Sequence, residues 1–175
     1  CPTNLKRKVK KLQNSEKISV IIDLCHALKE IHSIGIIHGN LKLENVFLDF
    51  ENHPKISGFG LSKVNLDVMS PSQKIKALKF MAPEQINGKD KCDEKVDVYA
   101  FGVVVYMILT GGEYPCIDSE EIAVGKMAEI PETITPFSGN LIKKCWSFNS
   151  SKRPSFDEIY NLLKNNETEI INVNE

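Results

Sequence analysis

One uninterrupted apolar run limits what this chain can fold into. Nearly every residue between positions 96 and 109 is apolar, and Gly111 and Gly112 follow directly. A helix that is apolar on all its faces is stable only between other packed elements. The valines leave a strand interpretation open, but about 17 residues is long for a strand, and Gly111 suits the end of a helix. We therefore predict a buried helix over 93–110 inside a helical bundle.

The remaining pattern predicts more helices and little strand. Apolar residues at helical spacing, together with His32, predict a helix that starts near Ser15 and ends at Gly35. Residues 57–81 show little periodicity and are expected to form a long loop, and 166–175 form a frayed polar tail. Further elements are expected as helices over 119–128, 138–147 and 154–165, and as short strands at 36–37, 46–48 and 55–56. The fold class is therefore mainly α.

Composition narrows the class of protein further. The 175 residues carry 22 basic and 23 acidic side chains, so the net charge of -1 argues against whole-surface attraction to nucleic acid or to an anionic membrane. No apolar run reaches the roughly 18 residues that a membrane span needs. The five cysteines are widely spaced and are expected to be free thiols in a reducing compartment, the cytoplasm or the nucleus. Because the chain begins with Cys1, it is expected to be part of a longer protein.

Five motifs in order resemble those of the protein kinase family. The segment His38 to Asn45 reads H-G-N-L-K-L-E-N, which is similar to the catalytic-loop pattern H-R-D-L-K-x-x-N. Gly58, Phe59 and Gly60 stand where the family has D-F-G. The remaining three motifs are A-P-E at 82–84, the central-helix segment 97–102, and Cys145-Trp146 followed by Arg153-Pro154. Lys42 resembles serine/threonine kinases, whereas the last motif resembles the tyrosine-kinase-like group.

The resemblance implies an α+β family fold of which this chain holds one lobe. Residues 1–165 are expected to form the C-terminal helical lobe, with short strands that carry the catalytic-loop and G-F-G segments, and 166–175 form the tail. The chain contains no glycine-rich loop, strand lysine or partner glutamate of an N-terminal lobe. That lobe is therefore expected to be absent from this chain.

Two substitutions affect the positions that the resemblance implies for chemistry. Asn40 stands where the family has its proton-accepting Asp, and an amide cannot take a proton at neutral pH. Gly58 replaces the metal-binding Asp of D-F-G, which leaves Asn45 as the only surviving metal ligand. A lone neutral amide holds Mg²⁺ weakly, so we expect no metal site. An inward turn of Glu44 as a substitute ligand is a minor alternative.

Three more positions depart from the family pattern. Gly39 replaces the arginine that pairs with an activation-loop phosphate in many kinases, and Ala77 holds the place of the loop threonine. Phe47 replaces a smaller aliphatic residue in the strand under adenine, where its ring would fill part of the nucleotide space.

The positions to which the resemblance gives an architectural role are retained. Glu84 and Arg153 match an ion pair that ties the end of the activation loop to the late helices. Asp97 matches the aspartate that holds the catalytic-loop backbone, and His38 and Phe59 match members of a hydrophobic stack behind the site. A chain that keeps these residues and loses the chemical ones resembles a pseudokinase.

Three hypotheses follow for function. The favoured one is a catalytically inactive kinase-like domain that binds a protein partner or a separate N-terminal lobe and needs no cofactor. The alternative is a serine/threonine kinase that uses ATP and Mg²⁺ with an N-terminal lobe encoded upstream, so the question of enzyme activity stays open. The third is a remnant without a function of its own.

Overall fold

The predicted apolar helix lies at the centre of the molecule. The computed structural model describes residues 2–59, 70–88 and 93–172. Helix α5 spans Lys95–Leu109, and every residue from Val96 to Ile108 is buried. Helix, rather than strand, is therefore the correct interpretation of this run, and the all-round burial explains why it carries no polar face.

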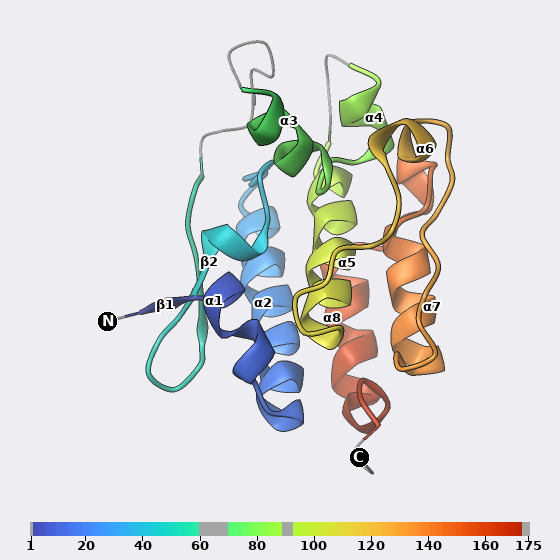
Figure 1. The fold of residues 1–175 in the computed structure, drawn as a ribbon. Coiled ribbons are helices and arrows are strands. Elements are labelled where there is room, and N and C mark those ends of the chain that lie inside the picture. The colour runs from blue at the N-terminus through green and yellow to red at the C-terminus, as the bar shows by residue number, and fades with distance from the viewer. Residues whose placement is uncertain (1, 60–69, 89–92, 173–175) are drawn as a thin grey trace.

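Three longer helices surround α5, and two of them, α2 and α8, also pack against each other (Figure 1). Helix α2 (Asn14–Ser33) contacts both α5 and α8 (Phe156–Asn165), whereas α7 (Pro136–Cys145) contacts α5. A capping box begins α8, in which Ser155 accepts from the backbone of Glu158 and the Glu158 carboxylate accepts from the Ser155 backbone N–H. These elements confirm the predicted mainly helical fold.

A small sheet lies at the edge of the bundle. Its strands are β1 (Thr3–Asn4), β2 (Val46–Leu48) and β3 (Pro54–Ile56), in the order β1-β2-β3 with antiparallel pairing. The pairing places Phe47 opposite Asn4 on one side and Lys55 on the other. The short elements that complete the fold are α1 (Leu5–Lys8), η1 (Val9–Lys11), η2 (Leu43–Asn45), α3 (Pro71–Leu78), α4 (Pro83–Ile86), α6 (Ser119–Ala123), η4 (Ser150–Lys152) and η5 (Glu167–Glu169).

Several local predictions were wrong. Residues 57–81 are not all loop, because α3 lies within them and begins at Pro71, whose fixed φ suits a first helical turn. Helix α6 ends at Ala123 rather than at 128, since Gly125 takes a φ of +87° that is incompatible with helix. Residues 36–37 form no strand, and the described residues offer them no strand partner.

The C-terminal segment also differs from the expected frayed tail. Ile170 is buried, and the hydroxyl of Ser138 donates to its carbonyl at 2.8 Å. The Thr135 hydroxyl donates to the Glu169 carbonyl at 2.6 Å. One apolar side chain and two hydroxyls from the start of α7 therefore hold a segment whose composition is mostly polar.

Among the cysteines that the structure describes, none forms a disulfide. Cys25 and Cys145 are buried and Cys116 is exposed. Burial raises the pKa of the Cys145 thiol to about 12, and it raises the pKa of Cys25 as well. The two buried cysteines therefore act as small apolar side chains in the core. None of the helices in the described ranges is long and apolar enough to cross a membrane.

Helices α5 and α7 meet at a glycine. A Cβ at Gly102 would lie 2.8 Å from the Trp146 indole nitrogen and 2.8 Å from the Cys145 Cβ. Both neighbours are buried, at 4% and 0% exposure, so neither has free space to move into. The indole therefore packs directly on the backbone of the central helix.

We expect Gly102→Ala to destabilise the fold by about 1–3 kcal/mol through overpacking, although alanine is the better helix former. Urea denaturation measures the change. Gly139→Ala in α7 is the matched control, because its Cβ would meet only the Ile130 Cγ2 at 3.2 Å. Equal effects of the two substitutions would contradict close packing at Gly102.

Candidate functional site

Asp97 in the first turn of α5 holds the catalytic-loop segment in place. Its carboxylate is 1% exposed. The Oδ2 atom accepts from the His38 backbone N–H at 2.7 Å, and Oδ1 accepts from the Gly39 backbone N–H, also at 2.7 Å. Two charge-assisted hydrogen bonds thus tie a loop without regular structure to the most buried helix.

His32 is a third partner of Asp97 and was missed as a site residue. Its side chain is only 11% exposed, and its Nε2 lies 2.8 Å from Asp97 Oδ2. Its ring also meets Phe156 edge-on at 4.9 Å. The available signal was its position on the apolar face of the predicted helix, where a polar residue needs a buried partner.

The His38 ring bridges the loop to the segment that follows β3. Nδ1 accepts from the Asn40 backbone N–H at 3.1 Å, so Nε2 carries the hydrogen and donates to the Ser57 carbonyl at 2.9 Å. The ring is fully buried and contacts Phe59 edge-on, with centroids 4.7 Å apart. Phe59 itself is 45% exposed, so only one side of it packs against the protein.

We expect Asp97→Asn to cost about 3 kcal/mol, because either amide orientation directs an NH₂ group at a backbone N–H donor and leaves it unpaired. Chemical denaturation measures the loss. Asp118→Asn is the matched control: Asp118 caps α6 by accepting from the Glu121 backbone N–H, and Asn caps helices equally well. A similar cost at both positions would argue against the loop-holding role of Asp97.

Three of the predicted site positions lie next to one another: Asn40, Asn45 and Gly58. The Asn45 Nδ2 donates to the Asn40 carbonyl at 2.8 Å, and the Asn45 carbonyl accepts from the Ser57 backbone N–H at 2.8 Å. The Ser57 hydroxyl donates to the same carbonyl at 3.1 Å. No described residue donates to Asn45 Oδ1, which leaves one neutral oxygen at the position of the expected metal ligand.

Gly58 lies directly against the Asn45 side chain. Its φ is +82°, and a Cβ there would lie 2.8 Å from Asn45 Nδ2 and 2.9 Å from Asn45 Cγ. Any larger residue at position 58 must therefore displace the amide that bonds to Asn40. Glycine in place of the family aspartate thus removes a negative charge from the site, and it also leaves room for the Asn45 side chain to lie against the backbone.

We expect Gly58→Ala to destabilise the protein by about 2 kcal/mol, from the left-handed backbone and the contact with Asn45. Gly35→Ala separates the two causes, because Gly35 has a φ of +75° but no atom within 4 Å of its Cβ position. That control should cost about 1 kcal/mol. In an Asn45→Ala background the cost of Gly58→Ala should fall to the control value; an unchanged cost in this double-mutant cycle would exclude the contact.

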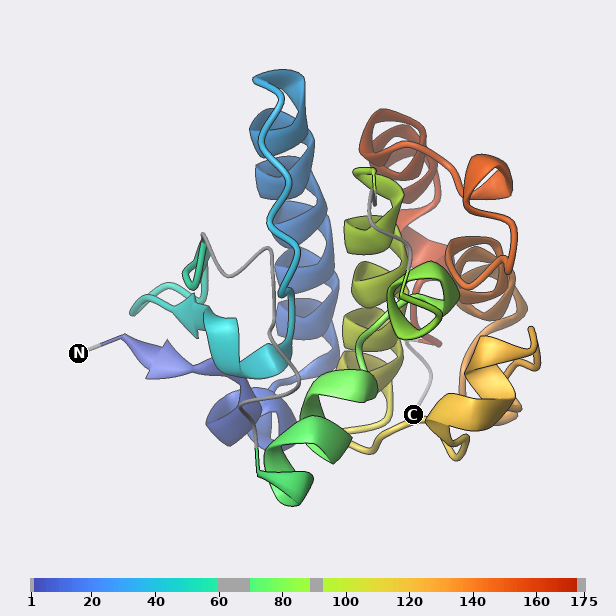
Figure 2. The same ribbon diagram turned by 90° about the horizontal axis from the view of Figure 1, so that it is seen from above.

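The other polar residues of the loop lie outside this cluster. Glu44 is directed toward α1, where its Oε1 accepts from Lys6 Nζ at 2.6 Å, and its Oε2 is buried without a hydrogen-bond partner among the described residues. Asn40 and Lys42 line a small hollow whose far wall includes Ala77 of α3. The hollow lies between α3 and the catalytic-loop segment, and Figure 2 shows the ribbons of these two parts of the chain near each other.

Phe47 lies on the face of the small sheet that points away from the core. Its neighbours Val46 and Leu48 are fully buried, whereas Phe47 is half-buried, as the alternation of a strand requires.

Gly39 has a φ of +70°, a conformation that the arginine of the family pattern would adopt only with strain.

A buried ion pair joins the end of the A-P-E motif to the late helices. Arg153 Nη1 and Nη2 donate to the two Glu84 carboxylate oxygens at 2.6 and 2.8 Å. The same guanidinium donates to the Ser147 carbonyl through Nε and to the Lys95 carbonyl through Nη1. Arg153 is 2% exposed, so these partners, together with the Tyr99 ring 5.2 Å away, stabilise its charge in place of water.

Comparison with known proteins agrees with this architecture. The protein tyrosine and serine/threonine kinase family matches residues 2–163. The chain belongs to the protein kinase family.

Individual relatives are kinases by name. A probable LIM domain-containing serine/threonine-protein kinase of Dictyostelium discoideum is 37% identical over 163 residues, which is 90% of this chain and 25% of that protein. A serine/threonine/tyrosine-protein kinase of Arabidopsis thaliana is 32% identical over 153 residues, which is 84% of this chain and 39% of that protein. The chain thus spans between a quarter and two fifths of the length of these relatives.

Proposed function

We propose that this chain is a catalytically inactive kinase-like domain that acts by binding another protein. One observation carries the proposal: Gly58 offers no carboxylate where the family binds metal, and the Asn45 side chain lies against the space that a carboxylate stem would need. The scaffold around this point, built on Asp97 and on the Glu84–Arg153 pair, is intact. A folded scaffold without its chemical groups is suited to binding.

The residues present do not fit Mg²⁺ as the family holds it. A hard cation favours carboxylate oxygens, and Mg²⁺ in kinases is held by the D-F-G aspartate together with the loop asparagine. Asn45 Oδ1 is one neutral oxygen, and Glu44 is paired with Lys6. Among the described residues, no three His, Cys, Asp or Glu side chains gather as a metal site. We therefore propose no nucleotide or metal cofactor for this chain.

The second missing group is the proton acceptor. Asn40 can accept a hydrogen bond from a substrate hydroxyl but cannot remove its proton. General-base catalysis contributes roughly 10²–10⁴ in rate, so its loss alone reduces phosphotransfer severely. Combined with the loss of the metal ligand, this substitution makes inactivity the better proposal.

A serine/threonine kinase is the second candidate. It is favoured by the names of the relatives and by Asn45, whose Nδ2 donates to the Asn40 carbonyl and whose Oδ1 receives no hydrogen bond from the described residues. In that case an upstream N-terminal lobe supplies most of the ATP contacts.

A protein partner and a cytoplasmic location complete the favoured proposal, that of an inactive kinase-like domain.

The test measures nucleotide binding and phosphotransfer separately, on this chain joined to its natural upstream sequence. We expect no thermal stabilisation by ATP·Mg²⁺ and no transfer to a generic serine/threonine protein substrate. The Asn40→Asp variant supplies the base without disturbing Asn45, and we expect it to remain inactive because the metal ligand is still missing.

Two outcomes would contradict the proposal. Turnover by the unaltered protein would establish the kinase alternative, and turnover by Asn40→Asp alone would show that Gly58 does not prevent metal binding. An Asn40→Asp, Gly58→Asp double variant restores both carboxylates, and its folding is checked by denaturation because Asp at position 58 meets the Asn45 amide.

A further inference from the structure

A hollow lies where α2 ends and where α5 and α8 begin. Its volume is about 430 Å³. The apolar part of its wall comes from four residues: Ile36, Ile37, Val98 and Phe156. Val98 belongs to α5 and Phe156 to α8, the two longer helices that contact α2. We call this space the α2–α8 hollow.

The α2–α8 hollow has the size and the lining of a small-molecule site. Ligand sites in proteins have volumes of roughly 300–1,000 Å³, they occur between helices of bundles, and their walls are mostly apolar with a few polar groups. The polar groups of this hollow include the His32 ring and the side chains of Ser33 and Ser155. Its volume and its lining are therefore both those of a site for a small molecule.

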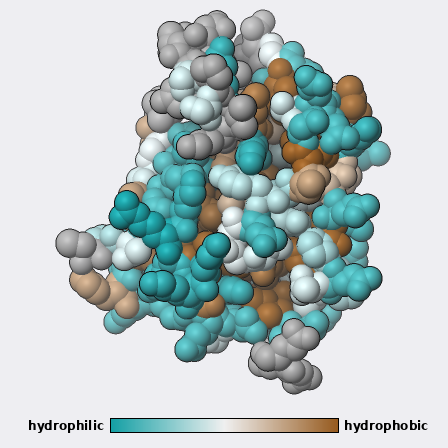
Figure 3. Space-filling view, viewed as in Figure 1, coloured by the Kyte–Doolittle hydropathy of each residue, from teal (hydrophilic) through white to brown (hydrophobic). Residues whose placement is uncertain are grey.

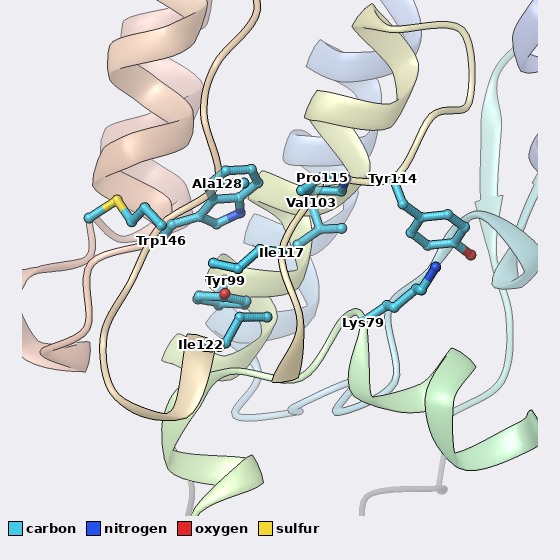
Figure 4. A pocket seen from close by; sticks show the side chains of 10 residues that line it. Lys79, Tyr99, Val103, Tyr114, Pro115, Ile117, Ile122, Ala128 and Trp146 are labelled. Carbon is cyan, nitrogen blue, oxygen red and sulfur yellow. The ribbon is translucent and has the colours of Figure 1, made fainter. Parts of the chain in front are cut away.

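The hollow beside Trp146 offers much less room (Figure 4). Tyr99 and Val103 give it an apolar wall, but its volume of about 20 Å³ holds only about one water molecule. Hydrophobic surface also appears around α6, at the upper right of Figure 3. The wider hollow there has a volume of about 220 Å³ and is bordered by Lys79 and Asp118. The α2–α8 hollow exceeds both of these in volume.

The charges around the α2–α8 hollow cancel. Four acidic or basic side chains line it, two of each sign: Lys29, Lys95, Glu94 and Asp157. Lys29 and Asp157 form an ion pair, with 2.7 Å between Nζ and Oδ1. The His32 ring is held by Asp97, whose Oδ2 lies 2.8 Å from its Nε2. Because these side chains leave no net charge to attract an ion, the lining favours an uncharged ligand.

An exposed isoleucine stands at the edge of this hollow. Ile36 lines the hollow and is 45% exposed. Ile34, two residues earlier in the chain, is 71% exposed and is not part of the lining. An exposed apolar side chain beside an apolar hollow marks a place where another molecule binds.

We propose that the α2–α8 hollow binds an uncharged, mainly apolar small molecule. The ligand packs against Ile37, Val98 and Phe156 and covers the exposed side of Ile36. Its binding stabilises the folded chain, since the hollow exists only when the ends of the three helices are in place. This inference does not rest on the proposed protein-binding function, and its test measures neither phosphotransfer nor partner binding.

The test uses the full chain and two fluorescent probes with the same ring skeleton. N-phenyl-1-naphthylamine is uncharged, whereas 8-anilino-1-naphthalenesulfonate carries an added sulfonate. We expect the uncharged probe to bind saturably at one site per chain. Its dissociation constant should be lower than that of the sulfonate by about tenfold or more. Equal affinities, or no saturable binding of the uncharged probe, would overturn the proposal.

Two variants locate the bound probe. Ile36→Glu places a charge at the edge of the hollow, and Ser33→Phe fills part of it without a charge. Each should weaken binding of the uncharged probe about tenfold or more. Ile34→Glu is the matched control, because it makes the same change at an isoleucine outside the lining, and it should bind the probe as the unaltered chain does.

Urea denaturation checks that each variant is folded. Undiminished binding by both Ile36→Glu and Ser33→Phe would mean that the probe binds elsewhere, and would overturn the proposal. An equal loss of binding in Ile34→Glu would do the same.

A second copy of this chain is the competing occupant. Concentration-dependent dimerisation in light scattering that Ile36→Glu abolishes, and that the uncharged probe does not reduce, would assign the hollow to self-association and would also overturn the proposal.

Discussion

The fold depends on one buried carboxylate. Asp97 accepts hydrogen bonds from two successive backbone N–H groups of the catalytic-loop segment and from the His32 ring, in surroundings that exclude water. Because a buried charge is tolerated only when it is fully paired, the loop and the end of α2 must both be in position for α5 to be buried. The central helix and the irregular loop are therefore stable only together, which explains how a segment without regular structure keeps a defined shape.

Most of the architecture was predictable because it rests on burial. The apolar run at 96–109 predicted α5, and helical spacing predicted α2, since both are set by the periodicity of side chains. The missed features depend on contacts distant in sequence. Ile170 is held by hydroxyls from the start of α7, and the role of His32 depends on an aspartate 65 residues away. The local pattern shows at most that His32 needs a buried partner; it identifies neither that partner nor the hydroxyls that hold Ile170.

The site was predictable in its residue identities and not in its geometry. Motif order located Asn40, Asn45 and Gly58 but said nothing of their distances. The structure adds that the Gly58 backbone, which has a positive φ, lies directly against the Asn45 amide. The two positions are therefore coupled through space. By contrast, the Glu84–Arg153 pair follows the resemblance closely because a bidentate pair between buried charges allows little variation in geometry.

The contact between Gly58 and Asn45 also limits what one mutation at position 58 can achieve. A carboxylate side chain introduced there would first meet the Asn45 amide and lower the stability of the fold. A second change that makes room at position 45 would be needed to accommodate it. Any redesign of this part of the molecule therefore has to treat the two positions as one unit.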